Sequence, residues 1–190
     1  MPRIKRNTLI KGVSGNYRRE FVYKVRGDQT YIAGMPEIDK KKPKTERQKK
    51  FRQKGVSARA YAKAAMADLE LKKFYNSRAT KLISAFNVAY QDFQKKPYVD
   101  EIQVKDYTGV AGSLVMVGAY DDIGKITGVT VQITSAAGVL IEEGPAIIND
   151  FLGGLWVYTS TQNNPVLAGT KIKATCKDLP KNEAFLEVTL

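Results

Sequence analysis

The 190-residue sequence predicts an α+β protein in which a β-hairpin and a helical segment precede a seven-stranded antiparallel β-sandwich. The hydrophobic period supports this fold class, because it is helical over about residues 45–95 and alternates from Val99 onward. The charge changes at the same place. Residues 1–97 carry 25 Lys and Arg against eight Asp and Glu, a net of +17, whereas residues 98–190 carry six against 11, a net of −5. We therefore expect a basic N-terminal region over 1–97 and a sandwich domain over 98–190.

The first expected element is a β-hairpin over about residues 17–34. Phe21–Val25 and Thr30–Ala33 are rich in β-branched and aromatic residues, as strands are. Between them, Arg26-Gly27-Asp28-Gln29 is a turn signal. Gly27 can adopt the positive φ that a tight hairpin turn requires, so this segment is predicted to reverse the chain.

A basic segment over residues 40–54 is the candidate binding region. It holds nine cations against one acid, Glu46, so it is either solvated or bound to something acidic. Along DNA or RNA, such side chains would neutralise phosphates and release counterions. The alternative is a solvated linker that leads into a polar helix. With two hairpin arginines, the candidate partner- or polyanion-binding residues are Lys40, Lys41, Lys42, Lys44, Arg47, Lys49, Lys50, Arg52, Lys54, Arg18 and Arg19.

Helical periodicity predicts helices over about residues 45–95. The first begins near Thr45, a good N-cap residue, and extends towards Ala67 with a thin, alanine-rich apolar stripe. Asp68 marks a break, after which a short second helix is expected. The third helix is expected from about Thr80 to Lys95 and has the better amphipathic pattern.

Alternating segments separated by turn signals predict seven strands in the C-terminal half. They are Val99–Tyr107, Ser113–Tyr120, Ile126–Thr134, Val139–Glu143, Leu155–Thr161, Thr170–Cys176 and Ala184–Leu190. One of the turns is expected at Gly144-Pro145. Cys176 ends an alternating run and is expected to face a core, as free cysteines usually do.

Residues 98–190 resemble the immunoglobulin-like or fibronectin type III-like modules of bacterial and phage surface proteins. Seven short strands over about ninety residues fit such a sandwich. The likeness is carried by Ala119-Tyr120-Asp121-Asp122-Ile123-Gly124, Val129-Thr130-Val131-Gln132-Ile133, Trp156-Val157-Tyr158 and Gly169-Thr170-Lys171-Ile172. The resemblance implies a scaffold whose loops make contacts.

Residues 9–54 resemble a second group, small bacterial proteins that include prophage-linked ones. The matching residues are Gly12-Val13-Ser14-Gly15, Val22-Tyr23-Lys24, Arg26-Gly27, Pro36 and Pro43-Lys44-Thr45-Glu46-Arg47-Gln48-Lys49. That group has no established activity, so this resemblance implies no mechanism.

The residue inventory argues against enzymatic chemistry. The chain has no histidine, which removes the commonest general base and the commonest metal ligand. Its one cysteine can form neither an internal disulfide nor a zinc cluster. Asp121-Asp122 and Glu142-Glu143 do not follow the spacing of a calcium loop. We expect no enzyme, no cofactor and no metal site.

The sequence therefore predicts a non-enzymatic structural or interaction protein of a larger assembly, such as a virion or a surface array. In this interpretation the sandwich presents contact loops and the basic region is the anchor. The alternative is a DNA- or RNA-binding protein that uses the basic half. Expected partners are other copies of the chain in a homo-oligomer, assembly proteins, or nucleic acid. We find no signal peptide and no apolar run of roughly 18 residues that could span a membrane, so we expect synthesis in the cytoplasm and export only within a virion or another assembly.

Overall fold

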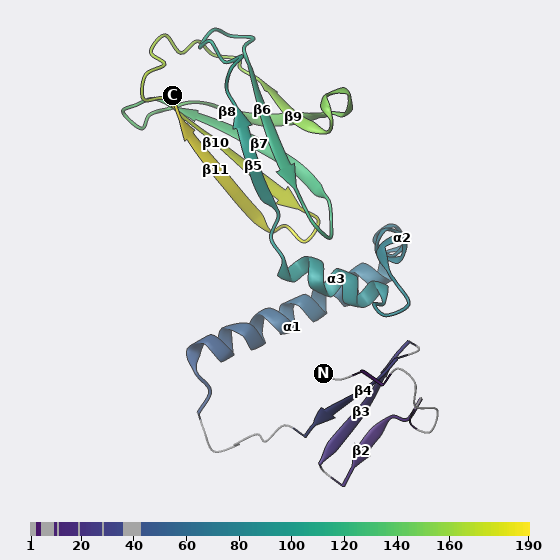
Figure 1. The fold of residues 1–190 in the computed structure, drawn as a ribbon. Coiled ribbons are helices and arrows are strands. Elements are labelled where there is room, and N and C mark those ends of the chain that lie inside the picture. The colour runs from purple at the N-terminus through teal and green to yellow at the C-terminus, as the bar shows by residue number, and fades with distance from the viewer. Residues whose placement is uncertain (1–2, 5–9, 11, 19, 28, 36–42) are drawn as a thin grey trace.

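The computed structural model describes residues 3–4, 10, 12–18, 20–27, 29–35 and 43–190 (Figure 1). Over these residues the chain forms a small antiparallel sheet, three helices and a larger antiparallel sheet, in that order. The predicted α+β class and the antiparallel, β-rich C-terminal half are therefore confirmed. We call the two sheets the N-terminal sheet and the C-terminal sheet.

The N-terminal sheet contains the predicted hairpin. Its strands are β1 (Arg3–Ile4), β2 (Gly15–Tyr17), β3 (Phe21–Arg26) and β4 (Gln29–Gly34), in the order β1-β4-β3-β2. Strands β3 and β4 pair around Gly27, whose φ is +57°. Strands β1 and β2 were not predicted, because two- and three-residue strands are too short to show an alternating pattern.

Helix α1 (Glu46–Ala67) begins where the sequence predicts. The Thr45 hydroxyl accepts a hydrogen bond from the Gln48 backbone amide at 3.3 Å, and the Gln48 side chain accepts one from the Thr45 amide at 3.1 Å. This reciprocal capping satisfies two amides that the first turn would otherwise leave unpaired. Ala58, Ala62 and Ala65 form the buried seam of α1, and α1 packs against α3.

Helices α2 (Leu69–Arg78) and α3 (Ala85–Gln94) follow. Asp68 breaks the helix as predicted, and its carboxylate caps α2 by accepting from two backbone amides at 2.9 Å. The predicted start of α3 at Thr80 is wrong. There the Thr80 hydroxyl accepts from the Ile83 amide at 3.1 Å and closes a turn, so the helix begins only after the next cap, Ser84.

The C-terminal sheet has seven strands, as predicted. They are β5 (Tyr98–Gln103), β6 (Leu114–Tyr120), β7 (Ile126–Thr134), β8 (Leu140–Asn149), β9 (Leu155–Thr159), β10 (Lys171–Asp178) and β11 (Glu183–Thr189). Their order is β11-β10-β7-β8-β9-β6-β5 with every pair antiparallel, and the two edge strands β11 and β5 also contact each other. The sheet is therefore curled and nearly closed around its core, in which Cys176 is buried as expected.

Strand boundaries differ most from the prediction at two places. The first predicted strand ends at Gln103 rather than Tyr107, because the Tyr107 amide donates back to the Val104 carbonyl at 3.1 Å and forms a turn. The turn predicted at Gly144-Pro145 is wrong, because both residues lie inside β8. Pro145 pairs with Thr130 of β7, and β8 pairs with β9 only from Ile147 onward. Proline is tolerated because β8 is paired on one side only at this position.

Gly144 is required by close packing within the C-terminal sheet. A Cβ atom at this position would lie 2.8 Å from Cε2 of the Tyr158 ring. We therefore expect Gly144→Ala to lower the free energy of unfolding by about 1–3 kcal/mol, measured by urea denaturation. Gly128→Ala in β7 is the matched control, because a Cβ there meets nothing within 4 Å, and its expected change is within about 0.5 kcal/mol. Equal destabilisation of both variants would contradict this packing argument.

Candidate partner interface

The first turns of α1 stand out because they have no buried side. Every residue from 43 to 54 is exposed, although residues 46–54 are helical. Six of the predicted binding residues lie in this stretch: Lys44, Arg47, Lys49, Lys50, Arg52 and Lys54. Arg18 lies in the turn after β2 and so belongs to a different element. Its guanidinium carbon lies 5.6 Å from the centre of the Tyr17 ring. Lys40, Lys41, Lys42 and Arg19 lie outside the described residues.

Two of these cations have polar internal partners, and the Arg47 guanidinium lies over the Phe51 ring, 5.7 Å from its centre. The Lys49 ammonium pairs with the Glu46 carboxylate at 2.6 Å, with both side chains exposed. The Lys54 ammonium donates to the Gln94 carbonyl at 2.8 Å, at the C-terminal end of α3, where a cation complements the helix dipole. The exposed Lys49–Glu46 pair contributes at most about 1 kcal/mol to stability. Because residues 43–54 contain six cations and one acid, the charge of this helix end is left largely unbalanced.

The exposed positive charge extends along α1 beyond Lys54, the last residue of the predicted binding segment. Successive residues of an α-helix are about 100° apart. We call the side of α1 opposite the buried alanine seam the basic stripe, and its cations are Lys49, Arg52, Arg59 and Lys63. All four are exposed, and no ion pair to Arg52, Arg59 or Lys63 is found among the described residues. The stripe is about 21 Å long, at about 1.5 Å per residue.

Arg59 and Lys63 were not predicted as binding residues, because they lie beyond the dense cationic run that ends at Lys54. The spacing of three, seven and four residues from Lys49 to Lys63 would have revealed them, since these intervals return to the same side of a helix.

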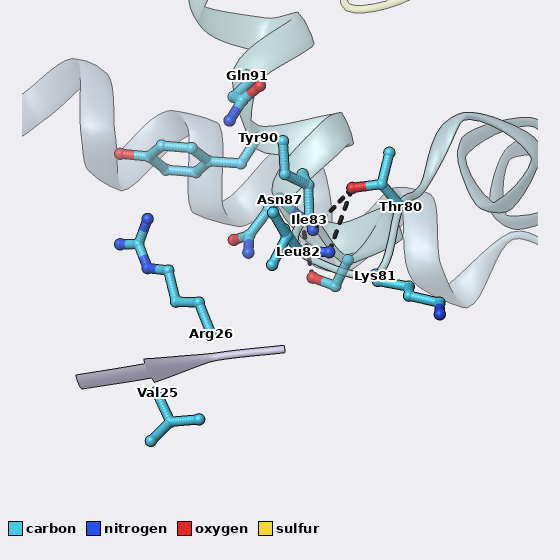
Figure 2. Close-up of a pocket in the computed structure, with 10 residues that line it drawn as sticks. Val25, Arg26, Thr80, Lys81, Leu82, Ile83, Asn87, Tyr90 and Gln91 are labelled. Carbon is cyan, nitrogen blue, oxygen red and sulfur yellow. Dashed lines mark hydrogen bonds between the residues drawn. The ribbon is translucent and has the colours of Figure 1, made fainter. Parts of the chain in front are cut away.

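A pocket lies between the hairpin turn of the N-terminal sheet and the start of α3 (Figure 2). Its volume is about 660 Å³. Figure 2 shows that Arg26 points towards α3 whereas Val25 points away from it. The lining includes two cations, Arg26 and Lys81, and the partly exposed Leu82, and no acidic residue lies among the lining residues that the structure describes. We call this cavity the β3–α3 pocket.

A buried carboxylate lies where the helices meet the C-terminal sheet. Asp92 of α3 has no exposed surface, and its Oδ2 accepts from the Tyr75 hydroxyl at 2.5 Å. The Tyr75 hydroxyl also lies 2.7 Å from that of Tyr61, so one polar chain joins all three helices. Among the described residues, neither the second oxygen of Asp92, Oδ1, nor Oδ2 of Asp121 has a hydrogen-bond partner. Burial raises the pKa of Asp92 to about 6; the hydrogen bond from Tyr75 opposes this shift, and the nearby charges of Asp121 and Asp178 add to it.

Two turns of the C-terminal sheet hold this end of α3. The Asn182 amide group donates to the Phe93 carbonyl at 3.4 Å and to the Lys95 carbonyl at 3.0 Å. In the turn between β6 and β7, Gly124 lies so close to Asp92 that a Cβ would be 2.4 Å from its Oδ1. Ile123 from the same turn packs against the helical core. We call this region the junction.

Three other carboxylates considered in the sequence, Asp121, Asp122 and Glu142, have structural partners, and Glu143 is exposed. Asp121 caps the turn between β6 and β7 by accepting from the Ile123 and Gly124 amides at 2.9 Å, and Asp122 pairs with Lys95 at 3.2 Å. Glu142 accepts four hydrogen bonds from the end of β9 and the loop that follows it. Within the described part of the chain, no group of three acidic or cysteine side chains could hold a metal ion.

The single thiol and the helices add two further facts. Cys176 has no exposed surface, and burial raises the pKa of its thiol, so the reactive thiolate is disfavoured. None of the helices in the described residues is long and apolar enough to cross a membrane.

Comparisons with protein-family models, with curated proteins and with solved structures found no match to this chain.

The raised pKa of Asp92 predicts a stability that falls as pH rises. The folded state binds the proton more tightly than the unfolded chain, so the stabilisation is complete below the ordinary pKa of aspartate and is lost as pH passes through about 6. Asp92→Asn, which stays neutral, should reduce the loss of unfolding free energy between about pH 4 and about pH 8 by about 1–3 kcal/mol. The slope is not abolished, because burial also raises the pKa of Asp178, which the variant retains.

Urea denaturation at both pH values tests this prediction. The control is Asp122→Asn, which removes an exposed carboxylate at the same junction and should leave the pH dependence close to that of the unaltered protein. An Asp92→Asn protein with an unchanged pH dependence would show that Asp92 is not the titrating group.

Proposed function

We propose that this protein is a non-enzymatic interaction protein of a larger assembly, anchored to an acidic partner through α1. One observation carries the proposal: residues 43–54 are exposed on every side of a capped helix and contain six cations against one acid. Most helical stability in proteins comes from packing of an apolar face, which this helix end lacks. A partner surface would supply both that packing and the missing negative charge.

We propose further that the C-terminal sheet is an immunoglobulin-like module that presents contact loops. The strand order supports this proposal. When β5 to β11 are lettered A to G, the order in the sheet is G-F-C-D-E-B-A. Constant-type immunoglobulin domains pair A, B, E and D in one sheet and C, F and G in the other. Here D, which is β8, pairs first with C and then with E, and so joins the two groups.

The non-enzymatic part of the proposal rests on side-chain chemistry. The chain has no histidine, and its only thiol is buried with a raised pKa. Asp92, whose pKa is raised to about 6, has no exposed surface. Its hydrogen bond to Tyr75 joins it to the helical core, so its position indicates a structural role.

DNA or RNA binding is the second candidate function, and the basic stripe favours it. The stripe contains four cations but no aromatic side chain, whereas protein–protein interface cores are depleted of lysine and enriched in aromatic residues. Phosphate backbones are recognised mainly by such cations. The two candidates make different predictions for random-sequence DNA.

The test replaces three cations of the basic stripe, Arg52, Arg59 and Lys63, by Gln. The control replaces Lys72, Lys73 and Lys125, which are equally charged and exposed but lie elsewhere. Self-association of the full chain is measured by sedimentation at several salt concentrations. We expect the stripe variant to associate more weakly than the control, most clearly at low salt, where screening is least. If the unaltered protein self-associates and both variants associate as it does, α1 is not the anchor between copies.

The same proteins are then titrated with random-sequence duplex DNA. If DNA is the partner, the unaltered protein binds it, and its affinity falls as the salt concentration rises. The slope of log K against log salt should then be shallower by about three for the stripe variant, because three phosphate contacts at about 0.9 each are lost. Binding that is equal for the stripe variant and the control would exclude the stripe as a nucleic-acid site.

A further inference from the structure

The hairpin that joins β8 and β9 carries an unusual apolar tip. Phe151, in the short 3-10 helix η1 (Asp150–Leu152), is 100% exposed, and Ile147 beside it is 74% exposed. The turn is held closed, because the Asn149 side chain accepts from the Phe151 amide at 3.0 Å and the Asn149 carbonyl accepts from the Gly154 amide at 3.2 Å. The backbone thus holds an aromatic ring out in water, next to the exposed carboxylate of Asp150.

A fully exposed ring of this kind is typical of a contact residue. Aromatic side chains that fill a pocket on a partner dominate the energy of most interfaces. The tip therefore calls for a partner site with two kinds of group, apolar side chains that contact the ring and positive charge beside Asp150.

The β3–α3 pocket offers both kinds of group within a lining that is mostly polar. Leu82, 48% exposed, and Ile83 provide apolar surface, while Arg26 and Lys81 provide positive charge, and the described lining residues include no acid. Its volume of about 660 Å³ lies within the range in which proteins bury ligands. The charges also agree at the scale of the chain, since the pocket belongs to the half with a net charge of +17 and the tip to the half with −5.

A tip cannot occupy the pocket of its own chain. In Figure 1 the β8–β9 hairpin projects sideways from the upper part of the C-terminal sheet, whereas α3 and the N-terminal sheet, which contribute the pocket's lining residues, lie below that sheet. The occupant must come from another molecule.

We propose that the Phe151 ring of one copy enters the β3–α3 pocket of a second copy, with Asp150 beside Arg26 and Lys81. This inference rests on the proposed assembly function and names its partner as another copy of the chain. Tip and pocket are different surfaces, so the contact is head to tail and each added copy exposes a new tip and a new pocket. Such contacts form rings or open filaments rather than closed two-fold dimers.

Cysteine cross-linking of the full chain tests the contact directly. The native Cys176 is buried and does not compete. Ile148→Cys in the tip hairpin and Asn87→Cys in the pocket lining leave Asp150, Arg26 and Lys81 in place, and these two proteins are mixed and oxidised. The control mixture combines Asn87→Cys with Lys105→Cys, whose cysteine is exposed elsewhere on the C-terminal half. We expect the first mixture to give at least about tenfold more disulfide-linked heterodimer than the control, as a defined rather than a random contact would. Equal yields would overturn the proposal.

A second variant removes the ring without adding a thiol. Phe151→Ala should weaken self-association on the order of tenfold or more, as the loss of an interface anchor does. Phe185→Ala is the control, because Phe185 is 65% exposed on β11, and it should have little effect. If association depends on the basic stripe but not on Phe151, this inference fails while the anchor function stands. A chain that is monomeric at every salt concentration overturns the inference, and the anchor function then depends on the DNA titration.

Discussion

The fold depends most on the burial of Asp92 at the junction. One oxygen of this carboxylate is bound by Tyr75, and the other faces Gly124 without a hydrogen-bond partner. Burying a charged group is costly, which is why the pKa of Asp92 rises and the group tends to keep its proton. The junction thus connects the helices to two turns of the C-terminal sheet through a contact whose strength depends on protonation. Neither part supplies this contact alone, since Asp92 comes from α3 and Gly124 from the turn between β6 and β7.

The junction also explains how the chain keeps opposite charges apart. Ile123 and Leu179, from two turns of the acidic C-terminal half, pack against the core that the helices form, while the first turns of α1 remain exposed with their cations. The basic stripe and the β3–α3 pocket lie on the same basic half, and the Phe151 tip lies on the acidic one. A molecule with complementary surfaces on its two halves is suited to contacts between copies, which is the physical basis of the assembly function proposed above.

The sequence predicted the features that depend on local pattern. The seven strands, the Thr45 cap, the break at Asp68 and the Gly27 turn each follow from alternation, capping chemistry or a positive φ. It failed where a distant contact decides the conformation. Gly144-Pro145 resembles a turn, but it lies within β8 because Tyr158 packs against the glycine and the strand changes partner there. Likewise, nothing local indicates that Asp92, on an amphipathic helix, meets a turn more than 25 residues away.

The central claim is that the junction makes the helices and the C-terminal sheet one cooperative unit. Trp156, the only tryptophan, lies in β9 against the core of the C-terminal sheet, so its fluorescence reports that sheet, while far-ultraviolet circular dichroism reports the helices. The most direct measurement follows both signals during urea denaturation of the full chain. Coincident midpoints are the result predicted by this account. Loss of the helical signal at a distinctly lower urea concentration, with the Trp156 signal unchanged, would contradict it.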